Sequence, residues 1–226
     1  MNKELIESKG LPYSDALRTI PTKKNCVYPA KEQIFNLFTK KYLFATLAAT
    51  DYDADYFNFI YRNLNTMYNY ESFFTDNDKI VLDKLLKKDS SVDTAEKSWL
   101  YEECFVLGWI MNLVDFPLQD RENNAEILND LLFLQFDEVE KKNLPSKIFN
   151  TLYDKELKKL NFERLVLKDF DEILEKADYL KRCLWGLEEL RINCQENTSG
   201  LSERVVDHQV NGFSAALQWD LTSPGV

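Results

Sequence analysis

The segment DEILEKADYLKRCLWGLEELRIN, residues 171–193, has the pattern of one long amphipathic helix. Its apolar residues recur at a spacing of three and four, which predicts a stripe that faces a hydrophobic core. Asp178 and Arg182 stand one turn apart beside this stripe, and Trp185 follows a further turn on. The segment therefore indicates a helical fold with a charged pair at the margin of its core.

A second segment, AEKSWLYEECFVLGWIMNLV at residues 95–114, is apolar on nearly every side after Ser98. Such a helix belongs in the middle of a core, so we expect the helix at 171–193 to pack across it. An unpaired carboxylate is costly in apolar surroundings, and Glu102 lies within this segment. We therefore expect Glu102 to form a buried ion pair with Arg182 or Arg191, while the adjacent Glu103 faces water.

The rest of the chain continues the helical pattern, broken by proline, glycine and polar runs. Further helical segments are expected at residues 2–9, about 29–49, 54–68, a capping-box start at Thr75 to about 86, 123–142, 146–169 and 201–217. The spacing predicts an all-α fold, a single compact domain over residues 1–226 with about eight helices around the central apolar helix (95–114). An irregular N-terminal arm at 10–28 and a short C-terminal tail at 218–226 complete the prediction.

Composition limits the class of protein. With 226 residues, 45% of them hydrophobic, the chain can bury one substantial core without disulfides, and its four cysteines show no CxxC spacing. A net charge of -10 opposes nucleic acid and anionic membranes but is compatible with a basic protein partner. The N-terminus shows no secretory signal, and the most apolar run is too short to cross a bilayer, so a cytoplasmic location is expected.

The motifs of common catalytic chemistries are not found in the sequence. The chain contains no GxSxG, HExxH, Walker A or GxGxxG pattern, and its one histidine, His208, excludes a two-histidine metal site. We expect His208 to be a surface or partly buried structural residue. The acidic run Asp51–Asp55 lacks the glycine and the glutamate that a calcium loop needs, because Tyr56 and Arg62 occupy those positions. No metal, cofactor or catalytic residue is therefore assigned.

One group of aromatic and charged residues is left as a candidate site. These residues either line a pocket or form a structural ion-pair cluster in the core, and aromatic residues at helical spacing are more often core. The members are Trp99, Tyr101, Glu102, Trp109, Asp178, Arg182, Trp185 and Arg191.

Three segments together resemble the bacterial family called domain of unknown function 4272. They are LIESKGLPYSDALRTIP with the following KEQIFNLFTKKYLFATLAA, then SWLYEECFVLGWIMNLVDFP, and finally ILEKADYLKRCLWGLEELRIN. In the C-terminal part the chain keeps Trp219 and Asp220 of the family pattern, while VVDHQVNGFSAAL before them is altered. The resemblance implies an all-helical cytosolic domain without an assigned activity.

Two kinds of function remain open. The first is a non-enzymatic, acidic interaction module, immunity-type or regulatory, whose negative surface speeds association with a basic protein partner. The second is an enzyme or small-molecule-binding protein with a pocket lined by Glu102, Asp178, Arg182 and the tryptophans. The second predicts that these side chains converge on one cavity.

Overall fold

The computed structural model describes residues 2–17, 21–48, 61, 73–132, 135–137, 142–144, 151–154, 156 and 159–219. The α-helices with assigned bounds are α1 (Asn2–Ser8), α2 (Lys31–Ala48), α4 (Asp76–Leu86), α5 (Thr94–Ser98), α6 (Leu100–Ile110), α7 (Glu126–Leu132), α9 (Phe170–Ile192) and α10 (Glu203–Leu217). A 3-10 helix, η2, spans Phe162–Arg164. Two short antiparallel hairpins pair β1 (Gln135–Asp137) with β2 (Lys142–Leu144) and β3 (Tyr153–Asp154) with β4 (Lys159–Leu160). The predicted all-α class and compact arrangement are confirmed.

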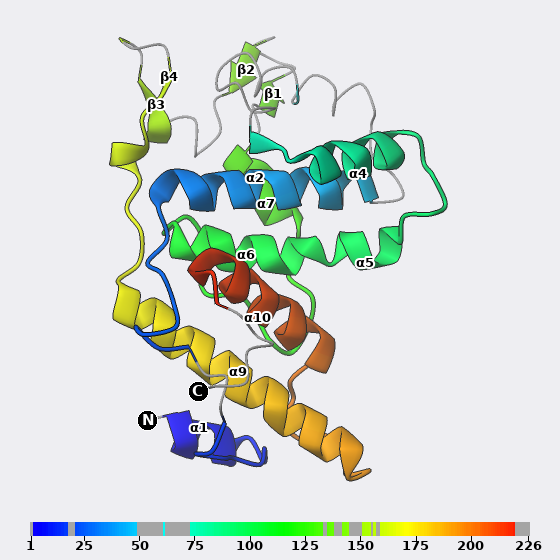
Figure 1. Ribbon diagram of the computed structural model, residues 1–226, viewed down its shortest axis with the longest axis vertical. Helices are drawn as coiled ribbons and strands as arrows, with labels where there is room; N and C mark the ends of the chain where they lie inside the picture. The colour runs from blue at the N-terminus through cyan, green and yellow to red at the C-terminus, as the bar shows by residue number, and fades with distance from the viewer. Residues whose placement is uncertain are drawn as a thin grey trace.

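The helices are stacked in layers, with α6 in the middle (Figure 1). One side of α6 packs against α2 and the other against α10, and α9 lies beyond α10 with α1 on its far side. An apolar surface all around α6 suits this position, because a helix between two neighbours buries both faces. The expected packing of 171–193 directly across 95–114 is wrong, since α10 is the main partner of α9.

A glycine allows α10 to approach α6 closely. A Cβ atom at Gly212 would lie 3.1 Å from both the Cα and the carbonyl oxygen of Glu103, and 3.1 Å from the Cβ of Val106. Any larger residue at Gly212 would push the two helices apart. This close approach explains how a short helix can separate α6 from α9 and still bury its own apolar face.

Most of the expected helices with local start and stop signals are found in the structure. The predicted capping box is present at α4, where the Thr75 hydroxyl accepts from the Asp78 N–H and the Asp78 carboxylate accepts from the Thr75 N–H. At the end of α1, Gly10 adopts a left-handed conformation with φ of +73°. The Ser202 side chain accepts from the Val205 N–H at the start of α10. These ends are fixed by neighbouring residues, which is why sequence predicts them.

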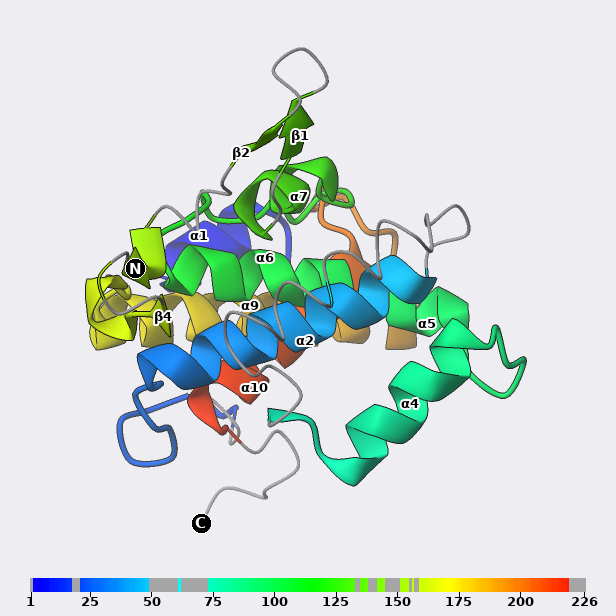
Figure 2. The ribbon, with the colours of Figure 1, turned by 90° about the horizontal axis from the view of Figure 1, so that it is seen from above.

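Three expectations about elements need correction. The segment 95–114 is two helices, α5 and α6, joined at Trp99, and the second ends at Ile110. The helix expected at 123–142 covers only α7 and gives way to the β1–β2 hairpin, which extends beside α7 (Figure 2). Within 146–169 the described residues 151–152 are helical, but the β3–β4 hairpin and η2 follow in place of a continuing helix. Such short apolar runs fit helical spacing and hairpins equally well.

The remaining expectations concern residues that lie outside the described part of the chain, or described residues without helix or strand. The helix expected at 54–68 and the acidic run Asp51–Asp55 lie outside the described residues, apart from Tyr61. The C-terminal tail is described only as far as Trp219, which is buried. In the N-terminal arm, residues 11–17 and 21–28 carry neither helix nor strand.

The core is continuous through the α2, α6, α10 and α9 layers. Its largest fully buried side chains include Phe35, Phe38 and Tyr42 of α2 and Phe213 of α10. Cys26, Cys104 and Cys183 are buried and free, as expected for reduced thiols, while Cys194 is exposed. None of the helices in the described part of the chain is both long enough and apolar enough to cross a membrane.

Candidate functional site

Asp178 and Arg182 form the predicted pair on α9, and this pair holds the N-terminal arm. The Arg182 Nε donates to both carboxylate oxygens of Asp178 at 2.9 and 3.0 Å, and its Nη1 donates to the Ser14 carbonyl at 2.6 Å. The guanidinium also stands 5.1 Å from the ring centre of Tyr13, and Asn2 donates to Asp178 at 2.9 Å. The pair therefore fastens α1 and the arm to α9.

The other predicted residues of α9 lie elsewhere on that helix. Arg191 is exposed and pairs with Glu203 at 3.0 Å, linking the end of α9 to the start of α10. Trp185 is half-buried. On α6, the Tyr101 hydroxyl donates to the Thr46 hydroxyl at 3.2 Å. These contacts are structural links between helices.

Glu102 is buried, with 3% of its surface exposed, but its partners are amides rather than arginines. Oε1 accepts from the backbone N–H of Asn123 at 2.7 Å, and Oε2 accepts from the Asn123 side-chain amide at 2.8 Å. Gln209 of α10 adds a third bond to Oε2 at 3.0 Å. The expected ion pair with Arg182 or Arg191 is wrong, because both arginines are held by carboxylates of α9 and α10.

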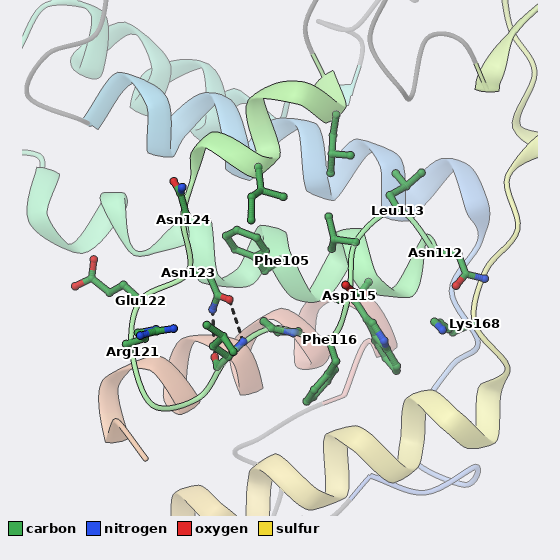
Figure 3. Close-up of a pocket in the computed structure, with 16 residues that line it drawn as sticks. Phe105, Asn112, Leu113, Asp115, Phe116, Arg121, Glu122, Asn123, Asn124 and Lys168 are labelled. Atoms are coloured by element: carbon green, nitrogen blue, oxygen red, sulfur yellow. Dashed lines mark hydrogen bonds between the residues drawn. The ribbon is translucent and has the colours of Figure 1, made fainter. Parts of the chain in front are cut away.

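These bonds fix the loop that follows α6. Asn123 closes the loop on itself, since its side chain accepts from the Leu118 N–H at 2.9 Å and donates to the Leu118 carbonyl at 3.1 Å (Figure 3). Gln209 also donates to the Leu118 carbonyl at 2.6 Å, and the Ser202 N–H donates to the Gln119 carbonyl at 2.8 Å. The loop is therefore tied to α6 by a buried carboxylate and to α10 by its backbone.

The same loop forms one wall of a pocket of about 950 Å³, which we call the loop pocket. Its apolar lining comes from α6, α7 and the residues between them: Phe105, Trp109, Leu113, Val114, Phe116, Pro117, Leu118, Ile127 and Leu131. Its polar lining comprises Asn112, Asp115, Arg121, Glu122, Asn123, Asn124 and Lys168. Arg121, Glu122 and Asn124 lie at one end and Asn112 and Lys168 at the other, with Phe105 between them (Figure 3).

Trp109 is the one residue of the predicted cluster in this lining. It is buried, packs edge-on against Phe116 at 5.1 Å and Phe213 at 5.9 Å, and carries the Lys168 ammonium 5.4 Å from its ring centre. No hydrogen bond or ion pair joins Glu102 to Asp178 or Arg182, and none of these three lines the loop pocket. The expected convergence of the charged residues and tryptophans on one cavity is therefore not found at the loop pocket.

A second buried polar cluster involves Glu103, which sequence placed in water. Glu103 is 6% exposed and binds the Lys41 ammonium of α2 at 2.5 Å. Its Oε1 lies 3.8 Å from Nδ1 of His208, while Glu96 of α5 lies 3.7 Å from Nε2. His208 is 5% exposed and stacks on Trp99 with ring centres 5.5 Å apart. This cluster joins α2, α5, α6 and α10.

Burial and pairing shift the pKa values of two groups in this cluster. Burial alone would raise the pKa of Glu103, but His208 and Lys41 outweigh that effect and hold it below the usual value. The adjacent Cys104 is fully buried, and burial raises the pKa of its thiol well above the ordinary range. Glu103 therefore stays charged as an ion-pair partner, and Cys104 stays a neutral thiol.

Sequence reasoning missed the residues that organise both clusters. No local pattern links the α6 carboxylates to their partners. Gln209 and Lys41 lie on other helices, far away in the chain, and Asn123 lies in a polar loop. One signal was available: Glu102 and Glu103 are consecutive, so a helix apolar on every side buries both. Each then needs a partner from a different neighbouring helix or loop.

One of three comparisons with known proteins agrees with the sequence resemblance. No curated protein and no solved structure shows significant similarity to the chain. The model of a family described as a domain of unknown function, DUF4272, matches residues 1–220. With nearly the whole chain matched, this protein belongs to the DUF4272 family.

Proposed function

We propose that this protein is a non-enzymatic binding module and that the loop pocket is where it binds a partner protein. The observation that carries the proposal is the use of the buried Glu102 carboxylate to hold the loop through Asn123. Asn123 is part of the pocket lining, so the buried Glu102 holds one wall of the pocket in place through it.

The physical argument rests on the cost of burying Glu102. A carboxylate removed from water loses its hydration, and an apolar residue of similar volume would give α6 a less costly core. What the carboxylate provides is a fixed shape for residues 118–123, which turn on the molecular surface. A rigid loop loses less conformational entropy on binding, so its preorganisation contributes to affinity.

The lining of the pocket suits contact with a protein. Leu118 and Ile127 are exposed apolar residues at 45% and 49%, and they border a lining in which Phe105, Trp109 and Phe116 supply aromatic surface. Exposed apolar residues beside charged ones are typical of protein interaction sites. The buried ionisable cluster of Glu103 and His208 lies outside this lining, which favours binding over acid-base chemistry there.

The buried free thiols support a cytosolic location for this binding activity. Cys26, Cys104 and Cys183 are reduced and inside the core, as is usual for proteins of a reducing compartment. We therefore infer that the module acts in the cytosol, as an immunity-type or a regulatory protein.

A small-molecule-binding protein is the second candidate. The pocket volume of about 950 Å³ lies within the range of small-molecule sites, and the aromatic side chains offer stacking surface. This alternative predicts that a metabolite, rather than a protein, slows hydrogen exchange of the backbone amides in the loop. It therefore requires no partner protein.

The test is photo-crosslinking from defined positions in the full chain. A crosslinking amino acid replaces Leu118 at the pocket. As the control, it replaces Ile192 at the end of α9, which is itself 65% exposed. We expect one protein to be captured in the native host from position 118 and not from 192. The captured protein is then purified, and its binding is measured for wild type and for Ile127→Asp.

The proposal requires that Ile127→Asp weaken binding of the purified partner while the protein stays folded. Equal capture from both positions, or a partner whose affinity Ile127→Asp does not change, would count against the loop pocket as the binding surface. A small molecule that protects the loop in the absence of any captured protein would favour the second candidate.

A further inference from the structure

We propose that the partner segment filling the loop pocket is basic, with an apolar side chain placed between lysine or arginine residues. This inference rests on the proposed function, since it assigns the chemistry of the partner at the same pocket. It combines the apolar lining, which accepts a side chain, with the charges around the opening.

The apolar anchor follows from the shape of the lining. Phe105 and Trp109 of α6 and Leu131 of α7 are buried and face the pocket, and Leu118 and Ile127 border it. A side chain that enters this space removes its own surface and theirs from water, which is favourable in proportion to the apolar area buried. A segment with only polar side chains gains none of this.

The basic character follows from which charges at the opening are already compensated. Asp115 and Glu122 both line the pocket and are exposed, and neither carboxylate makes a hydrogen bond or an ion pair with another described residue. Lys168 is engaged, because its ammonium lies over the Trp109 ring and 3.4 Å from Glu172. The carboxylates of Asp115 and Glu122 are therefore available to a ligand, whereas the Lys168 ammonium is not.

Arg121 does not reverse this balance. It is exposed and adds one cation, but Asp120 and Glu122 flank it in sequence and are exposed as well. The loop and the start of α7 add Glu126, which is also exposed. The opening is therefore negative on balance, in keeping with the net charge of -10, and it favours cations in a partner.

The charge also argues against two other occupants. A second copy of this chain would bring its own net charge of -10 to the interface, and like charges repel. An acidic segment would meet Asp115 and Glu122 directly. The acidic segment is represented in the experiment that follows by the peptide with flanking glutamates.

The experiment uses the full chain and short fluorescein-labelled peptides that share a central Leu-Phe-Leu. One peptide has flanking lysines, one has flanking glutamates, and one has flanking serines, while a fourth keeps the lysines but replaces the centre with glycines. Binding is followed by fluorescence anisotropy at low and at physiological salt. We expect only the lysine peptide with the apolar centre to bind, more weakly at higher salt.

A charge reversal locates the binding. Asp115→Lys/Glu122→Lys should weaken binding of that peptide about tenfold or more, because two attractions become two repulsions. The control Glu7→Lys/Glu196→Lys changes the net charge equally at exposed residues outside the pocket lining, and it should leave affinity within about twofold. Both double variants alter exposed side chains that make no hydrogen bond or ion pair within the described part of the chain, so we expect both to fold.

Several results would overturn the inference. If the glutamate or serine peptide binds as well as the lysine peptide, and Ile127→Asp abolishes that binding, the basic partner is wrong while the pocket stands. Equal weakening by the two double variants, or equal binding of the glycine-centred peptide, shows attraction to overall charge alone. If no peptide binds but crosslinking from position 118 identifies a partner, this inference fails and the proposed function does not.

Discussion

The two oxygens of Glu102 accept from the main-chain and the side-chain nitrogens of the same residue, Asn123, at 2.7 and 2.8 Å. This two-point contact joins a buried position on the central helix to a surface loop. Gln209 of α10 adds a third donor, 3.0 Å from Oε2. A group that presents fewer acceptors cannot keep all three bonds.

Replacing Glu102 by glutamine should therefore loosen the loop. The glutamine amide has one acceptor oxygen, and its NH2 group would face the donors of Asn123 or Gln209, leaving a buried polar group unpaired. We expect the free energy of unfolding to fall by about 1–3 kcal/mol, measured by urea denaturation. Hydrogen exchange at the Asn123 N–H should become faster than in wild type.

Glu122→Gln is the matched control for that change. It makes the same chemical replacement in the same loop, at an exposed residue whose side chain has no hydrogen bond among the described residues. Its effect on the free energy of unfolding should stay within about 0.5 kcal/mol. If the two variants behave alike, Glu102 does not brace the loop.

The Glu103 ion pair predicts how stability depends on pH. The pKa of Glu103 is lower in the folded protein than in the unfolded chain, where the pKa of a glutamate is about 4.3. A lowered pKa means that the charged group stabilises the fold above the unfolded value, and that this contribution is lost as pH falls through the folded value. Wild-type stability should thus decline on acidification below about pH 5.

Glu103→Gln should remove this part of the decline. The variant is less stable than wild type at neutral pH because Lys41 loses its anion, and the difference between the two narrows as pH falls. Urea denaturation at several pH values gives both curves. Parallel curves, with a constant difference at every pH, would contradict the assignment of Glu103 as a charged partner.

The sequence predicted those parts of the fold that depend on neighbouring residues. The period of apolar residues in 171–193 identified α9, and Thr75 with Asp78 identified the start of α4. The same reasoning found the Asp178–Arg182 pair, because residues four apart on a helix face each other. These features need no knowledge of how the helices pack.

The partners of Glu102 show why the remainder was not predicted. Burial of the carboxylate followed from the apolar helix around it, but its donors come from a loop and from α10. Amides satisfy a buried carboxylate as well as an arginine does, and residue type alone does not select between them. The position of α10 between α6 and α9 decides the matter, and Gly212 allows its close approach to α6.

Gly212→Ala tests that close approach. The added Cβ would stand 3.1 Å from backbone atoms of Glu103, which cannot move without shifting α6. Overpacking of this kind costs about 1–3 kcal/mol, against a gain in helix propensity of about 1 kcal/mol. Thermal unfolding should show a lower midpoint for Gly212→Ala.

Asn211→Ala on the same helix separates the two effects. Asn211 is half-buried and its side chain makes no hydrogen bond to any residue that the structure describes, so its replacement brings the gain in propensity without a steric cost. It should leave stability unchanged or raise it slightly. A midpoint for Gly212→Ala at or above that of Asn211→Ala would mean that α10 does not need the glycine.

The N-terminal arm gives a final prediction, because α9 carries two arginine–carboxylate pairs that differ in burial. Arg182 is 7% exposed and also binds the Ser14 carbonyl, whereas the side chain of Arg191 is 64% exposed and pairs with Glu203 alone. Removing one partner of a buried pair costs roughly 3–5 kcal/mol, but an exposed pair contributes about 0–1 kcal/mol. The loss of stability in Arg182→Ala should lie toward the lower end of the first range, since Asp178 keeps its bond from Asn2.

Arg191→Ala is the control and should be nearly neutral in the same urea denaturation. Limited proteolysis should cleave the arm of Arg182→Ala faster than that of Arg191→Ala. Equal stability and equal cleavage in the two variants would show that the Arg182 contacts do not hold the arm to α9.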